Sequence, residues 1–345
     1  MTIMNSYQAG TNLGGWISQY GEYDQDHFDS FISEADIEQI ASWGMDHIRL
    51  PVDYPVLADE ESGEYSEIGF EYIDDCLAWC NTHDLNLIID LHKAPGYSFN
   101  TLDENQLFDD PALQDRFVDL WATLTDRYDD IGDRLMFELV NEIVEPTSER
   151  WNALAHRTID AIRERDPDRY IVYGGNNYNA VDELENIELV DDDDRIVYTF
   201  HFYKPFLFTH QFASWSEVTR VYDTEVEYPG EYPELAAFLE EHPEYADGYE
   251  RFIGETIDAE HVESQLQPAV DFMNETGRPI YCGEYGAITQ APLESRINWY
   301  RDVIDILKSH EIGRACWSYK SMSFGLIDKD GEIASQEIID TVSER

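Results

Sequence analysis

Basic residues are scarce in this chain. Its 345 residues include 22 lysines and arginines against 73 aspartates and glutamates, a formal net charge of −51 at pH 7. Nucleic acids and anionic membranes are bound through basic patches, so we expect neither as a partner. A charge this far from zero destabilises a compact state by self-repulsion, and concentrated salt screens that repulsion. The composition therefore predicts a salt-adapted surface and a neutral substrate.

Long apolar runs and targeting segments are missing as well. No apolar stretch approaches the ~18 residues of a membrane-spanning helix. The opening MTIMNSYQAGTNLGGW has neither the basic region nor the apolar core of a secretory signal. We therefore expect a cytoplasmic protein, with secretion by another route left open. Phosphate-binding glycine motifs are also absent, so no cofactor is expected.

Eight short segments with β-strand character alternate with amphipathic helical stretches. The strand segments are 9–16, 46–52, 86–92, 135–142, 170–175, 196–203, 279–286 and 314–320. The expected helices are 34–44, 67–83, 111–129, 148–165, a short and weak 182–188, 262–276 and 293–310. Several strands are apolar on both faces, as parallel strands covered by helices are. The alternation predicts an α/β fold, one (β/α)8 TIM barrel over residues 1–345.

Two features depart from this regular pattern. Residues 205–262, after the sixth strand, are too long for an ordinary crossover and are interpreted as a small inserted subdomain. The four cysteines are expected to be buried free thiols, because Cys76 and Cys80 share one helix face without further zinc ligands. Strand alternation predicts that Cys282 points into the barrel and Cys316 outward.

Polar residues end most of the apolar strands. Active sites of (β/α)8 enzymes lie at the C-terminal ends of the strands, so these side chains should meet at one rim. They are Arg49, His92, Asn141, Glu142, His201, Tyr203, Glu284 and Trp317. Two carboxylates across a pocket suit glycoside hydrolysis, in which one donates a proton and the other attacks the sugar or activates water. We expect no metal among these residues.

The same residues carry a family resemblance over essentially the whole chain. The motifs NLGGW (12–16), IRLPV (48–52), DLH (90–92), FELVNE (137–142), HFY (201–203), YCGEYG (281–286) and CWSYK (316–320) resemble those of glycoside hydrolase family 5. Within that family the loops are most similar to those of clostridial endoglucanases. The resemblance implies a retaining endo-β-1,4-glucanase, a cellulase acting on β-1,4 or mixed-linkage β-glucan. We expect the chain to be a monomer.

The resemblance also implies a role for each rim residue. Glu142 would be the general acid/base and Glu284 the nucleophile, with Arg49 and Tyr203 holding and polarising Glu284. The remaining four would contact the sugar or tune the glutamates: Asn141 at the 2-hydroxyl, His92 and His201 at hydroxyls or carboxyls, and Trp317 as the floor of the cleavage subsite.

Loop residues near the rim are candidate sugar subsites. They are Trp16, Tyr97, Phe99, Asn176, Asn177, Phe206, Phe208 and Trp215. Asp90 and Glu138, which lie deeper in their strands, are interpreted as buried supports. Three alternatives stay open: a β-mannanase or β-1,3-glucanase of the same family, a non-catalytic glycan-binding barrel, and a metal-dependent barrel hydrolase using His92 and His201.

Overall fold

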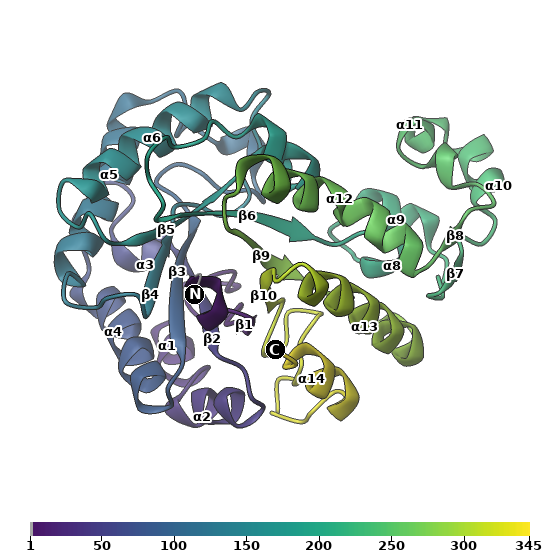
Figure 1. Ribbon diagram of the computed structural model, residues 1–345, viewed down its shortest axis with the longest axis horizontal. Coiled ribbons are helices and arrows are strands. Elements are labelled where there is room, and N and C mark those ends of the chain that lie inside the picture. Colours follow the sequence, from purple (N-terminus) through teal and green to yellow (C-terminus); the bar gives the residue numbers. More distant parts are fainter. Residues whose placement is uncertain (1–2) are drawn as a thin grey trace.

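Eight parallel strands close into a barrel in the order β1-β10-β9-β6-β5-β4-β3-β2 (Figure 1). This arrangement is seen in a computed structural model that describes residues 3–345. The strands are β1 Ala9–Asn12, β2 His47–Asp53, β3 Asn86–Lys93, β4 Leu135–Glu138, β5 Tyr170–Gly174, β6 Ile196–Phe202, β9 Ile280–Tyr285 and β10 Gly313–Cys316. Each lies within or next to one of the eight predicted segments, and the TIM barrel is confirmed.

Helices cover the outside of the barrel. They include α1 Gln25–Ser30, α2 Glu34–Ser42, α3 Tyr54–Leu57, α4 Glu67–Thr82, α5 Pro111–Arg127, α6 Glu149–Arg163, α12 Ala259–Thr276, α13 Leu293–Ser309 and α14 Gln336–Val342. The weak fifth crossover contains the four-residue helix α7 Asn176–Asn179 and a short 3-10 helix, Val181–Asn186. The C-terminal α14, which the periodicity did not indicate, packs against α13. No helix within residues 3–345 has the length and apolar character needed to cross a membrane.

The barrel interior changes from apolar to polar along its axis. One end is filled by a small cluster of buried side chains: Met4, Tyr7, Ile88, Met136, Val172, Val197, Tyr281 and Ala315. Farther along the strands lie the buried polar side chains of Arg49, Asp90 and Glu138. Side chains that point into a barrel of eight strands fill it in layers. The polar layer therefore lies directly beneath the rim that carries the candidate site.

A β-bulge in β9 corrects the predicted direction of one cysteine. The pairing of β6 with β9 shifts between Phe200 and His201, so that Cys282 and Glu284 face successive residues of β6. Tyr281 and Glu284 thus both point inward, and Cys282 packs in the outer core with Cys316. The extra residue of a bulge reverses the alternation beyond it. All four cysteines are buried free thiols.

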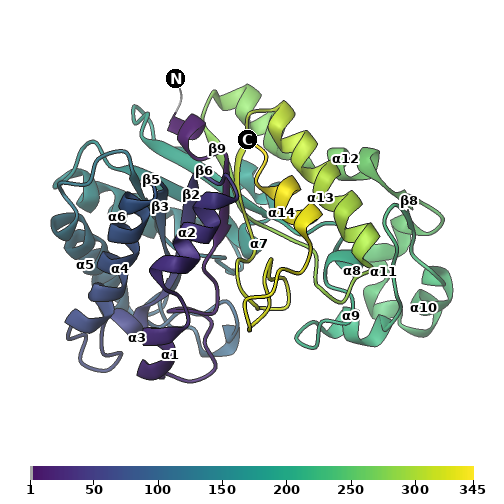
Figure 2. The same ribbon diagram turned by 90° about the horizontal axis from the view of Figure 1, so that it is seen from below.

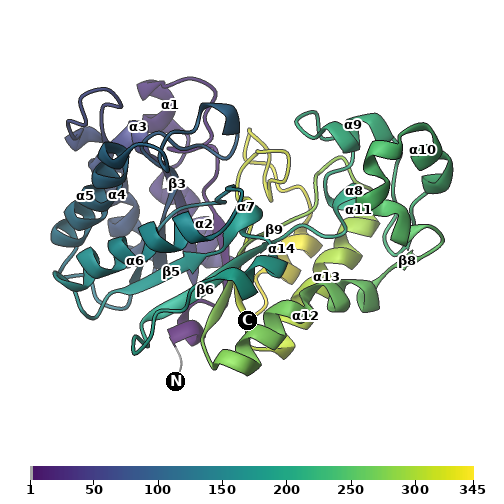
Figure 3. The ribbon, with the colours of Figure 1, turned by 90° about the horizontal axis from the view of Figure 1, so that it is seen from above.

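Residues between β6 and β9 extend beside the barrel (Figure 1). They form α8 Phe206–Thr209, α9 Glu217–Tyr222, α10 Leu235–Glu241, α11 Ala246–Tyr249 and a small antiparallel pair, β7 Gly230–Glu231 with β8 Thr256–Ile257. Figure 3 shows this part on the far side of the loop after β10 from α1 and α3. Its apolar residues, such as Phe208 and Tyr228, are continuous with the main core.

The first described residues and the C-terminal residues lie at the same end of the barrel, opposite α1, α3 and α9 (Figures 2 and 3). The first strand closes the barrel against the last, with Ala9 paired to Arg314 and Thr11 to Cys316. The opposite end, where the strands finish, is therefore free to carry long loops.

Candidate active site

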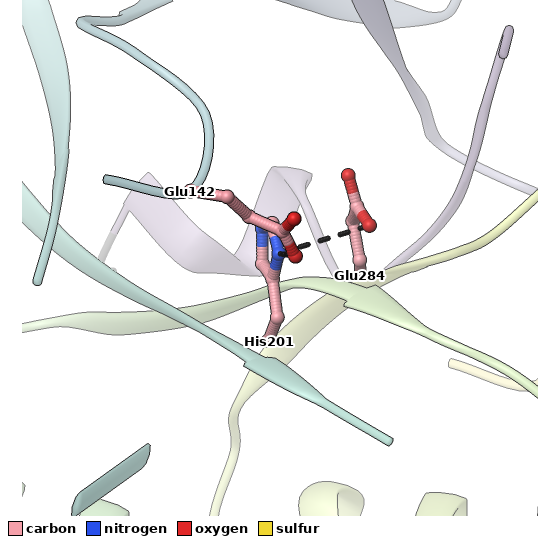
Figure 4. A group of neighbouring side chains, drawn as sticks. All are labelled: Glu142, His201 and Glu284. Atoms are coloured by element: carbon pink, nitrogen blue, oxygen red, sulfur yellow. Dashed lines mark hydrogen bonds and ion pairs between the residues drawn. The ribbon is translucent and has the colours of Figure 1, made fainter. Parts of the chain in front are cut away.

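Three predicted rim residues converge at the C-terminal end of the barrel. Glu142 follows β4, His201 lies in β6, and Glu284 lies in β9 (Figure 4). One oxygen of each carboxylate and Nδ1 of His201 all lie within 4.8 Å of one another. The two glutamates approach from different strands and face each other across the position of His201.

Arg49 anchors the base of the site. Its guanidinium donates from Nε to Oε2 of Glu138 at 2.7 Å and from Nη2 to Oε1 of the same residue at 2.9 Å. Nη1 donates to Oε1 of Glu284 at 2.8 Å and to Oδ1 of Asn12 at 2.9 Å. Nη2 also lies 3.1 Å from Oδ2 of Asp90. One fully buried cation thus contacts three carboxylates and fixes the orientation of Glu284.

Glu284 receives a second hydrogen bond from Tyr203, whose hydroxyl donates to Oε2 at 2.8 Å. Burial raises the pKa of Glu284, while Arg49 and the Tyr203 hydrogen bond act in the opposite direction and favour the ionised form. These contacts match the holding role that was predicted for both residues.

Glu142 has no such cationic partner. Nδ1 of His201 lies 2.8 Å from its Oε1, and burial together with the charge of Arg49 lowers the pKa of His201 well below its ordinary value. The imidazole is therefore neutral at pH 7. Burial, and secondly the charge of Glu284, raises the pKa of Glu142 well above its ordinary range. The two glutamates thus differ in the way a proton donor and a nucleophile must.

His92 and Trp317 form one wall of the site. Their rings stack with centroids 5.5 Å apart and planes 4° apart. Nδ1 of His92 lies 2.6 Å from Oδ2 of Asp90, and its Nε2 lies 2.6 Å from Nε2 of Gln19. Burial lowers the pKa of His92 to about 3. Because both ring nitrogens are engaged, His92 supports the Trp317 ring more directly than it offers a hydrogen bond to a sugar.

Asn141 has one free polar group. Its Oδ1 accepts from Nη2 of Arg49 at 2.9 Å, which fixes the amide orientation. Its Nδ2 is buried and has no hydrogen-bond partner. A buried donor without a partner costs free energy, which a sugar hydroxyl at this position would recover. The geometry fits the contact to the 2-hydroxyl that the resemblance implied.

Four of the eight loop candidates are not sugar platforms. Trp16 is only 1% exposed and stacks on Trp79 of α4, and Phe208 is fully buried against Tyr228. Both are core residues, because a loop residue next to a barrel can also fill the layer between strands and helices. Tyr97 and Asn176 are buried as well and hydrogen bond to the loop after β4.

The other four candidates remain partly accessible. Phe99 packs edge-on against His92 with centroids 5.2 Å apart, and Asn177 is exposed. Phe206 stacks on His210 at 4.3 Å. Trp215 is 59% exposed and lies 6.4 Å from Phe324. These positions stay predictions for sugar contacts.

Sequence reasoning missed two residues that support the site. Asn12 ends β1 and accepts from Arg49, while its Nδ2 donates to the backbone oxygen of Gly283 at 3.1 Å. A polar residue ending an apolar strand was the available signal for Asn12. Gln19 contacts His92 from a loop, with φ of 54°, and no sequence pattern indicated it.

Glu142, His201 and Glu284 also form the one group of three potential metal ligands found within residues 3–345. His92 does not belong to this group, since Asp90 and Gln19 occupy its nitrogens. A cation bound there would contact both carboxylates and so occupy the space between them. The ligand set that the metal-dependent alternative requires, His92 with His201, is not brought together.

Comparisons with known proteins agree with this geometry. A family model described as cellulase (glycosyl hydrolase family 5) matches residues 4–323. Endoglucanase C of Acetivibrio thermocellus is 47% identical over 343 residues, which cover 99% of each chain. Cellodextrinase A of Ruminococcus flavefaciens is 35% identical over 309 residues, covering 89% of this chain and 84% of the relative.

Solved structures show the same fold. The crystal structure of an endoglucanase from the hyperthermophile Thermotoga maritima superposes with a TM-score of 0.81 at 23% identity, covering 99% of this chain and all of the other. A hyperthermophilic endo-β-1,4-glucanase solved with substrate gives a TM-score of 0.79 at 21% identity over the full length of both chains. At these identities the likeness concerns the fold.

Proposed function

We propose that this chain, which belongs to the cellulase family, glycosyl hydrolase family 5, and is therefore a retaining endoglucanase, works through Glu142 as general acid/base and Glu284 as nucleophile. We propose further that its substrate is a soluble, uncharged β-1,4 or mixed-linkage β-glucan. The residue assignment rests on the short distance between the carboxyl groups of Glu142 and Glu284, of which only the second is bonded to a cation, Arg49.

The separation supports direct attack on the sugar. Oxygens of Glu142 and Glu284 lie within 4.8 Å of each other. Retaining glycosidases hold their carboxyl groups about 5–5.5 Å apart, whereas inverting enzymes need roughly 6.5–9.5 Å to place a water molecule between sugar and base. The short distance between these two residues therefore favours direct attack by one of them over attack by an intervening water.

The first step is the transfer of the glycosyl group to Glu284. An ionised oxygen of Glu284 forms a bond to the anomeric carbon while the glycosidic bond breaks. Glu142 gives its proton to the departing oxygen, so the leaving sugar departs as an alcohol and Glu142 becomes a carboxylate. Arg49 keeps Glu284 oriented for attack, and Tyr203 bonds its other oxygen.

The second step releases the product with the original configuration. Glu142, now ionised, takes a proton from a water molecule that attacks the anomeric carbon on the face left by the first product. The bond to Glu284 breaks, and both carboxyls return to their starting states. The neutral state of His201 serves the first step, because a charged imidazole beside Glu142 would lower the Glu142 pKa and leave less of this carboxyl protonated before the sugar departs.

Uncharged substrates suit the strongly acidic chain, because an anionic polysaccharide would be repelled wherever salt is low. The ring of Trp317, backed by the buried His92, would supply an apolar face for a pyranose ring. These features favour glucan over acidic polymers. The choice between glucan and mannan depends on the partly accessible loop residues, and the uncharged polymers barley glucan and mannan should be compared directly.

Product configuration tests the mechanism. Hydrolysis of a β-glucan oligosaccharide, followed by NMR, should first yield the β-anomer. An initial α-anomer would overturn the role of Glu284 as nucleophile. Glu284→Gln should lower kcat by about 10⁴-fold or more while calorimetry still detects oligosaccharide binding, because the amide keeps the side-chain shape but is not a nucleophile.

A further inference from the structure

The acid/base residue lies on a segment without secondary structure of its own. Strand β4 ends at Glu138, and residues 139–148 precede the next helix, α6. Glu142 has φ of 44°, in the left-handed region that non-glycine residues rarely adopt. Such a conformation persists only where surrounding contacts enforce it. The neighbours of residues 141–145 should therefore determine where the Glu142 carboxyl lies.

Tyr97 makes two of these contacts with a single hydroxyl. It donates to the backbone oxygen of Glu142 at 2.9 Å and accepts from the backbone nitrogen of Val144 at 2.7 Å. The ring is only 3% exposed. The Tyr97 backbone is itself fixed by two reciprocal hydrogen bonds to Ala94, at 3.0 and 3.1 Å. Through Tyr97, the loop after β3 therefore holds the backbone of both Glu142 and Val144.

Asn176, the first residue of α7 after β5, holds the same segment from the other side. Its Oδ1 accepts from the backbone nitrogen of Glu145 at 2.9 Å, and its Nδ2 donates to the backbone oxygen of Glu145 at 2.8 Å. The backbone nitrogen of Tyr178 donates to the oxygen of Ile143 at 3.1 Å. Backbone groups of residues 142–145 are thus bonded to loops on both sides.

We propose that Tyr97 is a positioning residue for proton transfer, and that Asn176 assists it by holding the other end of the segment. This inference rests on the proposed role of Glu142 as general acid/base. Without the Tyr97 hydroxyl, the Glu142 carbonyl and the Val144 N–H lose the partner that they share. The backbone at Glu142 then relaxes from its left-handed conformation, and the carboxyl moves relative to the glycosidic oxygen. Catalysis is sensitive to displacements of about 1 Å, which can cost 10²-fold in rate.

The role can be measured through the dependence on the leaving group. Dinitrophenolate departs without protonation, whereas phenolate and sugar alkoxides need a proton. In Tyr97→Phe, kcat/KM on phenyl β-cellobioside should fall by about 10- to 10²-fold, within the range that general acid catalysis supplies. On dinitrophenyl β-cellobioside, kcat/KM should fall by less than about 3-fold, because Glu284 is untouched. Asn176→Ala should show the same selectivity with a smaller amplitude.

Azide gives a second readout. It attacks the glycosyl-enzyme without needing a base, so it should raise kcat of Tyr97→Phe on the dinitrophenyl substrate and yield a β-glycosyl azide. A variant that is merely less stable would not respond to azide. Equal losses on both aryl substrates with no azide response, or no loss on either, would overturn the proposal.

A matched control separates positioning from folding. Tyr198 of β6 is fully buried, and its hydroxyl accepts from the backbone nitrogen of Val190 at 3.0 Å, outside the segment that carries Glu142. Tyr198→Phe should lower the melting temperature without changing the ratio of kcat/KM between the two substrates. Glu142→Ala gives the leaving-group selectivity that is expected when the general acid is removed completely. If that variant shows no leaving-group selectivity, the proposed role of Glu142 fails; if it does and Tyr97→Phe does not, only the positioning role fails.

Discussion

Nη1 of Arg49 lies 2.8 Å from Oε1 of Glu284, although the same guanidinium is also bonded to both carboxylate oxygens of Glu138. Burying a cation costs free energy unless carboxylates surround it, and burying those carboxylates requires the cation. The holding of the nucleophile and the stability of the barrel interior therefore depend on one side chain.

Replacing Arg49 by lysine should damage both properties. A lysine has one ammonium in place of a planar fork, so it cannot bond Glu138 in two places and reach Glu284. Loss of one partner from a buried ion pair costs about 3–5 kcal/mol, which urea unfolding followed by circular dichroism would measure. The kcat on β-glucan should also fall. Arg314→Lys is the control, since buried Arg314 bonds the backbone oxygens of Gln8 and Glu344, and it should lose stability with activity retained.

The pH profile should separate the two glutamates. Activity needs ionised Glu284 and protonated Glu142, so it falls as pH drops below the pKa of the first and as pH rises above that of the second. Glu142→Gln, assayed with dinitrophenyl β-cellobioside, should keep the acid limb of kcat/KM and lose the alkaline limb. On β-glucan the variant should be slower by about 10²–10⁴-fold. An alkaline limb retained on the activated substrate would contradict the assignment of Glu142.

Stability should fall on mild acidification because of a buried histidine. Burial lowers the pKa of His210 to about 3, against about 6.5 in the unfolded chain. The folded state binds fewer protons than the unfolded state below pH 6.5, so this contribution is complete above that pH and is lost as pH falls. Between pH 6.5 and 5.0, wild type should lose roughly 1.5 kcal/mol more than His210→Phe. Equal slopes in denaturant titrations would mean that His210 is not kept neutral.

Salt should stabilise the chain. The net charge is −51, and its carboxylates repel one another over about 10 Å at 0.1 M salt but over only about 3 Å at 1 M. We propose salt adaptation on this basis and expect the melting temperature to fall on desalting, by about 2–4 °C for each kcal/mol lost. Sorbitol is the control for effects of solvent exclusion. A melting temperature that does not change with sodium chloride would contradict the proposal.

The order of elements and the rim were predictable, because both depend on patterns that repeat along the chain. Two periodicities, together with eight residues at the ends of six strands, were enough to bring Arg49, Glu142 and Glu284 together. The path of the chain beyond a strand end was harder to predict. Asn141 and Glu142 were expected inside the fourth strand, yet β4 ends at Glu138, and a left-handed residue then places the carboxyl.

The errors share a physical cause, namely that local patterns do not report register or depth. Alternation placed Cys282 inside the barrel, but the bulge in β9 gives the inward position to Glu284. The sequence does not show whether an aromatic residue on a rim loop packs inward, as Trp16 does, or faces solvent, as Trp215 does. Only the three-dimensional path of the loop distinguishes the two.

The pairing of β1 with β10 has a consequence for the order of events during synthesis. Thr11 and Cys316, which bond across this seam, are 305 positions apart. Until β10 has left the ribosome, β1 keeps an open edge, and a nascent chain that ends before β10 exposes edges on both β1 and β9. Open edges can pair with other chains. The barrel can therefore close only after β10 has emerged, and the rim that joins Arg49 to Glu284 is completed only then.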